Sequence, residues 1–179
     1  IHSGLKTSDG GTIRGGRQKS AKAVADDPAY TLRLKYTGLP GLELAATAQY
    51  QSEITQGIAA DDASATLLEA HAIYQTGPFA VRALWAGWDV EGNGFDATGR
   101  DEQQGWYIEP SIKPLDNLGF FIRYSEYNNQ AGFSSSDEVG TWDYGLNYWF
   151  HPQVVLKADY SNVRDNGNDS LNVGLGWSF

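Results

Sequence analysis

The chain has 179 residues, contains no Cys and no Met, and carries a formal net charge of −9. This acidic balance argues against nucleic-acid binding, because phosphate contacts need a basic surface. The lack of Cys excludes disulfides and thiolate metal sites. No run of eighteen apolar residues is present, so the sequence predicts no transmembrane helix.

Apolar and polar residues alternate with a period of two, which predicts β-strands that each have one apolar face. In chain order, residues 1–6 resemble the tail of a strand, and nine complete segments follow. The apolar positions of these segments are Tyr30, Leu32, Leu34 and Tyr36; Leu42, Leu44, Ala46, Ala48 and Tyr50; Leu68, Ala70, Ala72 and Tyr74; Phe79, Val81, Ala83 and Trp85; Trp106, Ile108 and Ile112; Leu118, Phe120, Ile122 and Tyr124; Trp142, Tyr144, Leu146, Tyr148 and Phe150; Val154, Leu156, Ala158 and Tyr160; and Leu171, Val173, Leu175, Trp177 and Phe179.

The connections between these segments alternate between short and long. Short turns are predicted at Gly38–Gly41, Gly77–Pro78, Leu115–Asn117 and His151–Gln153, where Gly, Pro, Asn and Asp suit turn geometry. Longer polar stretches occupy residues 7–27, 54–63, 92–103, 129–139 and 164–169. Short turns at one end and long loops at the other are typical of an outer-membrane barrel.

A soluble antiparallel sandwich or barrel would also alternate. Three features favour the membrane barrel instead. Aromatic residues gather at the ends of the segments, as at membrane–water interfaces. The polar faces carry charge on segment after segment, which a packed interior could not bury unpaired. The chain also ends on Phe179, inside a strand. We therefore expect an all-β fold, an antiparallel transmembrane β-barrel located in the outer membrane of a Gram-negative bacterium.

The number of strands sets what kind of barrel this can be. Residues 1–179 are expected to form a single barrel domain or the C-terminal portion of one. With nine or ten visible strands, the chain is either a ten-stranded barrel or part of a larger one. The second interpretation is favoured, because the first segment begins at Ile1 with no turn before it, and we expect a mature or truncated product.

Several stretches resemble a known family. Residues 144–161 (YGLNYWFHPQVVLKADYS) look like the penultimate hairpin of bacterial porins related to the phosphate-selective porin O and P group. Residues 39–57 and 105–114 resemble internal hairpins of the same porins, and the terminal LNVGLGWSF resembles the strand that the barrel-assembly machinery recognises. The resemblance implies a pore of sixteen to eighteen strands, usually trimeric, with Leu175, Trp177 and Phe179 as the assembly signal.

The polar face of such a barrel would line water. Its charged positions are Arg33, Lys35, Glu43, Glu69, Arg82, Glu109, Lys113, Arg123, Asp143, Lys157 and Asp159. One interpretation is a weak basic track for anions such as phosphate, formed by Arg33, Lys35, Arg82, Arg123 and Lys157. The alternative, which we favour, is that these residues are solvated or paired across strands, since nearly balanced wall charges make a poor filter.

The stretch 7–27 has a basic centre of Arg14, Arg17, Lys19 and Lys22. It could fold inward as a constriction or hold lipopolysaccharide, but its glycines favour an ordinary flexible, solvated loop. His2, His71 and His151 lack metal-ligand spacing, and residues 164–170 lack the ligand pattern of an EF-hand loop. We therefore expect no catalytic residues, no metal and no cofactor.

The function expected from the sequence is passive diffusion of small polar or ionic solutes, without enzymatic activity. The expected partners are the lipid bilayer, lipopolysaccharide, the barrel-assembly machinery, small ions or solutes, and two further copies in a homotrimer. The alternative is a non-conducting scaffold barrel that associates with other envelope components. Strand number separates the two, because about ten strands enclose little beyond side chains, whereas about sixteen leave a channel.

Overall fold

The computed structural model describes residues 1–135, 138–164 and 168–178. It contains one sheet of nine antiparallel strands, in which every strand pairs with its neighbours in the sequence. The strands are β1 (Tyr30–Tyr36), β2 (Leu42–Gln51), β3 (Ser64–Thr76), β4 (Phe79–Glu91), β5 (Glu102–Leu115), β6 (Leu118–Asn128), β7 (Val139–His151), β8 (Val154–Val163) and β9 (Ser170–Trp177). All nine expected strands are confirmed.

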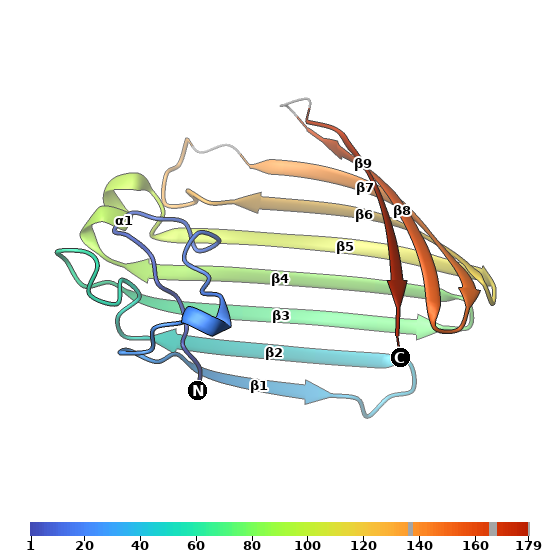
Figure 1. Cartoon of the computed structure of the whole chain (residues 1–179), viewed down its shortest axis with the longest axis horizontal. Coiled ribbons are helices and arrows are strands. Elements are labelled where there is room, and N and C mark those ends of the chain that lie inside the picture. Colours follow the sequence, from blue (N-terminus) through green and yellow to red (C-terminus); the bar gives the residue numbers. More distant parts are fainter. Residues whose placement is uncertain (136–137, 165–167, 179) are drawn as a thin grey trace.

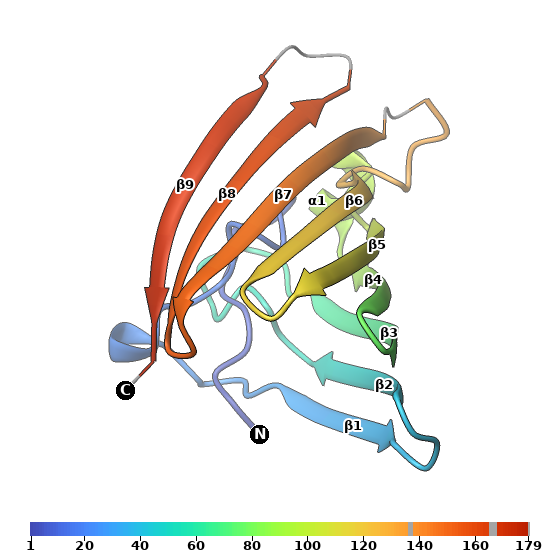
Figure 2. The ribbon, with the colours of Figure 1, turned by 90° about the vertical axis from the view of Figure 1, so that its right-hand side faces the viewer.

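The sheet is strongly curled. Figure 2 shows a trough whose two rims are β1 and β9. In the described residues these two strands each pair on one side only, with β2 and β8 respectively. The four predicted short turns join strands at one end of the sheet, and the long connections gather at the other (Figure 1). One long connection contains the short helix α1 (Asn93–Thr98), and a 3₁₀ turn (Ser20–Lys22) precedes β1.

The convex face of the sheet is apolar and exposed. Leu32, Leu34, Leu171 and Val173 are each about two-thirds exposed or more, which would be costly in water but is favourable against lipid chains. Aromatic rings form a row toward the long-loop end of this face. In that row Trp106, Tyr124 and Trp142 contact one another in sequence, with ring centroids 5.4 and 4.9 Å apart.

The small buried core lies inside the trough, at the long-loop end. It consists of Leu5, Ile54, Ala63, Ala65, Val90 and Phe95, with Ile13 and Trp88 packed against it. These residues come from the N-terminal segment (residues 1–29), from the long connections and from the ends of β3 and β4. The core therefore fastens the N-terminal segment to the concave side of the sheet.

One expectation about the chain start is wrong. Residues 1–6 form no strand; they make only isolated backbone bridges, between His2 and Ala29 and between Leu5 and Arg17. The segment doubles back on itself and lies across the concave face (Figure 1). The physical reason is that Leu5 gains a buried site there, which an extended edge strand would not provide.

Candidate functional site

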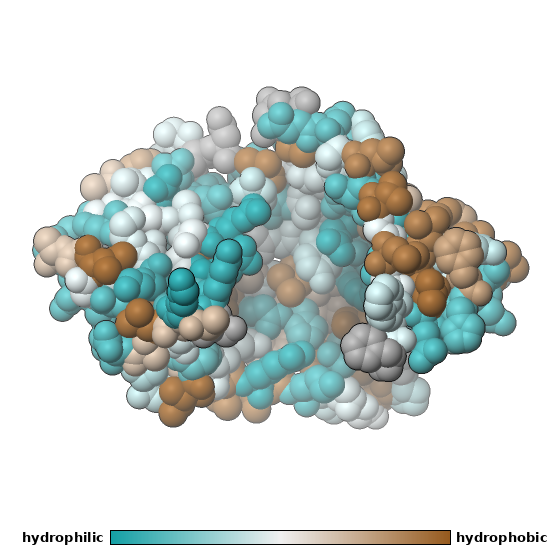
Figure 3. All heavy atoms as spheres, viewed as in Figure 1, coloured by the Kyte–Doolittle hydropathy of each residue, from teal (hydrophilic) through white to brown (hydrophobic). Residues whose placement is uncertain are grey.

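The N-terminal segment identifies the inward face of each strand that it contacts. His2 Nε2 lies 3.0 Å from Thr31 Oγ1 on β1, and the backbone N–H of Ile13 donates to Gln103 Oε1 on β5. Because side chains alternate along a strand, residues at even spacing from Thr31 and Gln103 share this face. Arg33 and Glu109 therefore lie on the concave wall, and Figure 3 shows hydrophilic side chains over this hollowed face.

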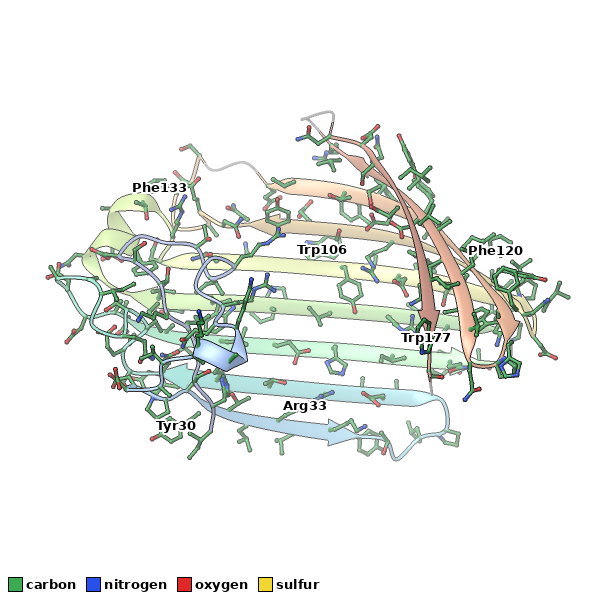
Figure 4. All side chains as sticks on the ribbon, in the orientation of Figure 1. Tyr30, Arg33, Trp106, Phe120, Phe133 and Trp177 are labelled. Atoms are coloured by element: carbon green, nitrogen blue, oxygen red, sulfur yellow. The ribbon has the colours of Figure 1, made fainter. Side chains whose placement is uncertain are left out.

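A first charged cluster joins β1, β2 and β3. Glu43 lies between two cations, with its carboxylate 3.2 Å from Lys35 Nζ and 3.8 Å from Arg33 Nη2. His71 Nδ1 lies 2.6 Å from Glu69 Oε1, and Arg33 Nη2 lies 3.3 Å from His71 Nε2. Figure 4 shows Arg33 on its strand. The two cations of β1 are thus balanced by one glutamate on β2 and one on β3.

A second charged cluster is centred on Glu109. Its side chain is only 4% exposed, whereas those of Arg82 and Arg123 are 48% and 39% exposed. Arg82 Nη1 donates to Glu109 Oε1 at 2.6 Å, and Arg123 donates to Oε2 from Nε at 2.9 Å and also from Nη2. A buried carboxylate needs such charge-assisted bonds. The guanidinium of Arg123 also lies 4.8 Å from the ring centroid of Tyr107.

The remaining predicted wall residues have polar or aromatic neighbours. Asp143 accepts a hydrogen bond from Ser161 Oγ, and Asp159 accepts one from Asn172 Nδ2 at 2.9 Å. Lys113 Nζ lies 4.6 Å from the ring centroid of Trp149. Lys113 and Lys157 make no ion pair with any residue that the structure describes.

The five cations of the suggested basic track are therefore not equivalent. Arg33 and Lys35 are paired with Glu43, and Arg82 and Arg123 are paired with Glu109. This agrees with the interpretation that most of them are paired across strands. In the proposed assembly signal, Leu175 and Trp177 are exposed on β9, and Phe179 lies outside the described residues.

The short-turn half of the concave wall contains a cavity of about 680 Å³. Two aromatic residues of its lining, Phe121 and Trp149, were missed by the sequence analysis because they occupy positions expected to be polar. A side chain at Gly145 would overlap the Phe121 ring, and a Cβ at Gly119 would lie 3.3 Å from Trp149 Cζ3. The two rings therefore lie across glycines of the neighbouring strands, against the wall.

A buried amide holds the N-terminal segment in place. Gln51, at the end of β2, is fully buried. Its Oε1 accepts from the backbone N–H of Leu5 at 2.8 Å, and its Nε2 donates to the backbone oxygens of Leu5, Asp27 and Glu53, each at 3.0 Å. One side chain thus binds both ends of the segment. Sequence alternation marks Gln51 only as an inward polar residue and gives no sign of this role.

Further contacts fix the middle of the segment. Arg100 Nη1 donates to the backbone oxygen of Gly10 at 2.6 Å, and Gln56 Nε2 donates to that of Asp27 at 2.8 Å. The expectation of a solvated, flexible loop over residues 7–27 is therefore wrong for its anchored part, where Thr7, Gly10 and Gly16 are buried. The basic residues of its centre, Arg14, Arg17, Lys19 and Lys22, remain exposed.

Two carboxyl groups meet in the loop after β2. Burial pushes the pKa of Glu53 upward, but hydrogen bonds from Thr55, Asp62 and the backbone of Ala63 outweigh it, so that this pKa lies below its ordinary value. The pKa of Asp62 is raised, because its carboxyl bonds to Glu53 and is repelled by the Glu53 charge. Asp62 therefore holds the proton of this pair more tightly than an isolated aspartate would.

We expect Asp62→Asn to stabilise the protein at neutral pH. A group whose pKa is raised in the folded state stabilises the fold in acid, and this contribution is lost as the pH rises through the raised pKa. Asparagine keeps a hydrogen-bond donor at every pH. The melting temperature of the variant should exceed that of the native protein at pH 7.5, and the difference should shrink toward pH 4. A difference that grows in acid would contradict the assignment.

The described part of the chain offers no cluster of three His, Asp or Glu residues suited to a metal ion. Both ring nitrogens of His71 contact carboxylates, those of Glu43 and Glu69. Within the described residues, no helix is long and apolar enough to cross a membrane.

Comparison with known proteins relates the chain to porins. A family model described as Gram-negative porin matches residues 3–168. An uncharacterized protein of Aquifex aeolicus (strain VF5) is 24% identical over 222 aligned residues, which cover 100% of this chain and 49% of the relative. The chain thus spans about half the length of that relative. The structure of the KdgM porin in complex with disordered oligogalacturonate aligns over 84% of this chain and 92% of its own, at 14% identity and a TM-score of 0.32.

Proposed function

Because this chain belongs to the Gram-negative porin family, it is an outer-membrane protein and not an enzyme, and we propose that it forms the wall of a water-filled diffusion channel. Small polar solutes cross the outer membrane along its concave face. The observation that carries the proposal is the division of the sheet into an apolar convex face and a concave face with two charged clusters. The apolar convex face can contact lipid, and the charged concave face can contact water.

Further strands complete the channel. In lipid, the free edges of β1 and β9 would leave backbone groups without hydrogen-bond partners, so the sheet must close. Sixteen to eighteen strands in all, and a homotrimer, are what the resemblance to the phosphate-selective porin group implies. Insertion by the barrel-assembly machinery through Leu175, Trp177 and Phe179, and contact with lipopolysaccharide at the rim, belong to the same proposal.

The N-terminal segment narrows the channel and gives it a modest preference for anions. Residues 1–29 contain five Lys and Arg residues against three Asp, and the basic centre of the segment is exposed beside the concave face (Figure 1). The wall beneath it is nearly neutral, because its clusters are internally paired. Selectivity for phosphate itself would need free cations on the wall. Among the wall cations that the structure describes, Lys113 and Lys157 alone make no ion pair.

Conductance in planar bilayers tests the proposal. The complete porin should give steady single-channel currents, with a reversal potential of anion-selective sign in a KCl gradient. Replacing Arg14, Arg17, Lys19 and Lys22 together by glutamine should lower the anion-to-cation permeability ratio roughly threefold, most strongly at low salt.

A matched variant keeps the charge and changes only the side chains: Arg14→Lys, Arg17→Lys, Lys19→Arg and Lys22→Arg. It should retain the native permeability ratio. An unchanged permeability ratio in the glutamine variant would show that the segment does not set the selectivity of the channel. No current from a folded, inserted barrel would overturn the channel itself and favour the scaffold alternative.

A further inference from the structure

The cavity in the short-turn half of the wall lies apart from the N-terminal segment. It is lined near the turns by Gln75, Pro78, Lys113, Trp149 and Val155, whereas the segment is anchored to Gln51 and Arg100 at the long-loop end. Its volume of about 680 Å³ falls within the range of small-molecule sites. A solute that has passed the segment would meet this cavity next.

The rings of Phe121 and Trp149 give the cavity apolar surfaces. Each ring lies beside a glycine of the neighbouring strand. A cation lies over each ring, with Lys113 Nζ 4.6 Å from the centroid of Trp149 and the Arg123 guanidinium 6.0 Å from that of Phe121. The face of an aromatic ring carries partial negative charge and attracts the partly positive C–H groups of a saturated ring. Lys113, which lies over Trp149, has a flexible stem that lets its ammonium move aside for a ligand.

The charged lining of the cavity has both signs. Arg82, Arg123, Lys113 and Lys157 provide hydrogen-bond donors, and Asp143 and Asp159 provide acceptors. Glu109 already neutralises part of the positive charge from beneath, bound to both arginines. A simple anion would be attracted by the four cations of this lining but repelled by Asp143 and Asp159. A hydroxyl group both donates and accepts, so a polyhydroxylated solute can use all of it.

Apolar ring faces and two-signed polar groups in one cavity match the chemistry of a sugar. We propose that the cavity between β4 and β8 is a binding subsite for a neutral sugar of hexose size, which places its C–H face on Phe121 and Trp149. Arg82, Lys157, Asp143 and Asp159 bind its hydroxyl groups. The inference rests on the proposed channel, because the sugar reaches the subsite through the water-filled interior.

The test uses the complete porin in planar bilayers with glucose as the probe. Glucose added in millimolar steps should raise the current noise and lower the mean KCl current in a saturable manner. Loss of a stacked ring in Phe121→Leu should weaken the apparent affinity about tenfold. Trp149→Phe keeps a flat ring and should retain most of the affinity, which separates stacking from a general disturbance of the wall.

Phe79→Leu is the matched control, because it removes the same kind of ring from the convex face, where Phe79 is 56% exposed and does not line the cavity. Its KCl current and its response to glucose should equal those of the native porin. A polyethylene glycol of similar size should lower the current without saturation. Equal saturation by this polymer, or stronger blockage by inorganic phosphate than by glucose, would overturn the sugar subsite. An absence of any KCl current would instead defeat the channel, whereas KCl current without saturable glucose blockage defeats only this inference.

Discussion

Replacing Gln51 by leucine is expected to raise the single-channel conductance about twofold, because the N-terminal segment loses its anchor and leaves the channel. Leucine matches the size of glutamine but cannot bond to the segment. The buried backbone N–H of Leu5 then loses its partner, and the carbonyls of Leu5, Asp27 and Glu53 lose one donor. Each buried polar group left unpaired costs about 1–3 kcal/mol, which shifts the balance toward release although Arg100 and Gln56 still bind the segment.

Gln49→Leu provides the control. Gln49 lies two residues earlier on the same face of β2, and its one side-chain hydrogen bond within the described residues is accepted from Thr31 Oγ1, at 3.2 Å. Its conductance should match the native value. Faster proteolytic cleavage within residues 7–27 of the Gln51→Leu variant would show the release directly. Native conductance together with native resistance to cleavage would mean that the amide does not hold the segment.

Glu109→Gln is expected to weaken the barrel and to make the channel more anion-selective. The amide leaves Arg82 and Arg123 side by side without their shared counter-charge. Removing one partner of a buried ion pair is strongly destabilising, but water reaches both guanidinium groups. A loss of roughly 1–3 kcal/mol in the free energy of unfolding is therefore expected. The added positive charge on the wall should raise the anion-to-cation permeability ratio.

The comparison with Glu43→Gln separates the two effects. Glu43 is 28% exposed against 4% for Glu109, and it also serves two cations. Its loss should shift selectivity in the same direction and cost less stability in urea unfolding. Equal losses of stability in the two variants would show that burial does not set the importance of the Glu109 cluster.

The strands could be predicted from sequence because lipid and water act on opposite faces of each one. Tyr30, Leu32, Leu34 and Tyr36 alternate without interruption, and the structure forms β1 over the same residues. The short turns were equally predictable. Between β3 and β4, for example, only Gly77 and Pro78 separate the two strands, and both residue types favour tight turns. Here local chemistry alone decides the structure.

The inward fold of the N-terminal segment could not be predicted in this way. Leu5 and Ile13 are isolated apolar residues in a polar stretch rich in glycine. The burial of Leu5 depends on Ile54 and Phe95, which come from distant connections. The inward positions of Phe121 and Trp149 could not be predicted for a related reason. A rule that assigns apolar residues to lipid overlooks an aromatic ring among polar neighbours, and the glycines that accommodate these rings lie on other strands.

The anchored segment is also an electrical element. A charge that moves through the full transmembrane potential gains or loses about 2.3 kcal/mol per 100 mV. The segment has an excess of two positive charges, so an applied voltage can do work on it comparable with the strength of the hydrogen bonds at Gln51. One polarity pushes the segment against its anchor and the other pulls it away. In the proposed channel, the position of the segment, and with it the width of the channel, would therefore depend on the applied voltage.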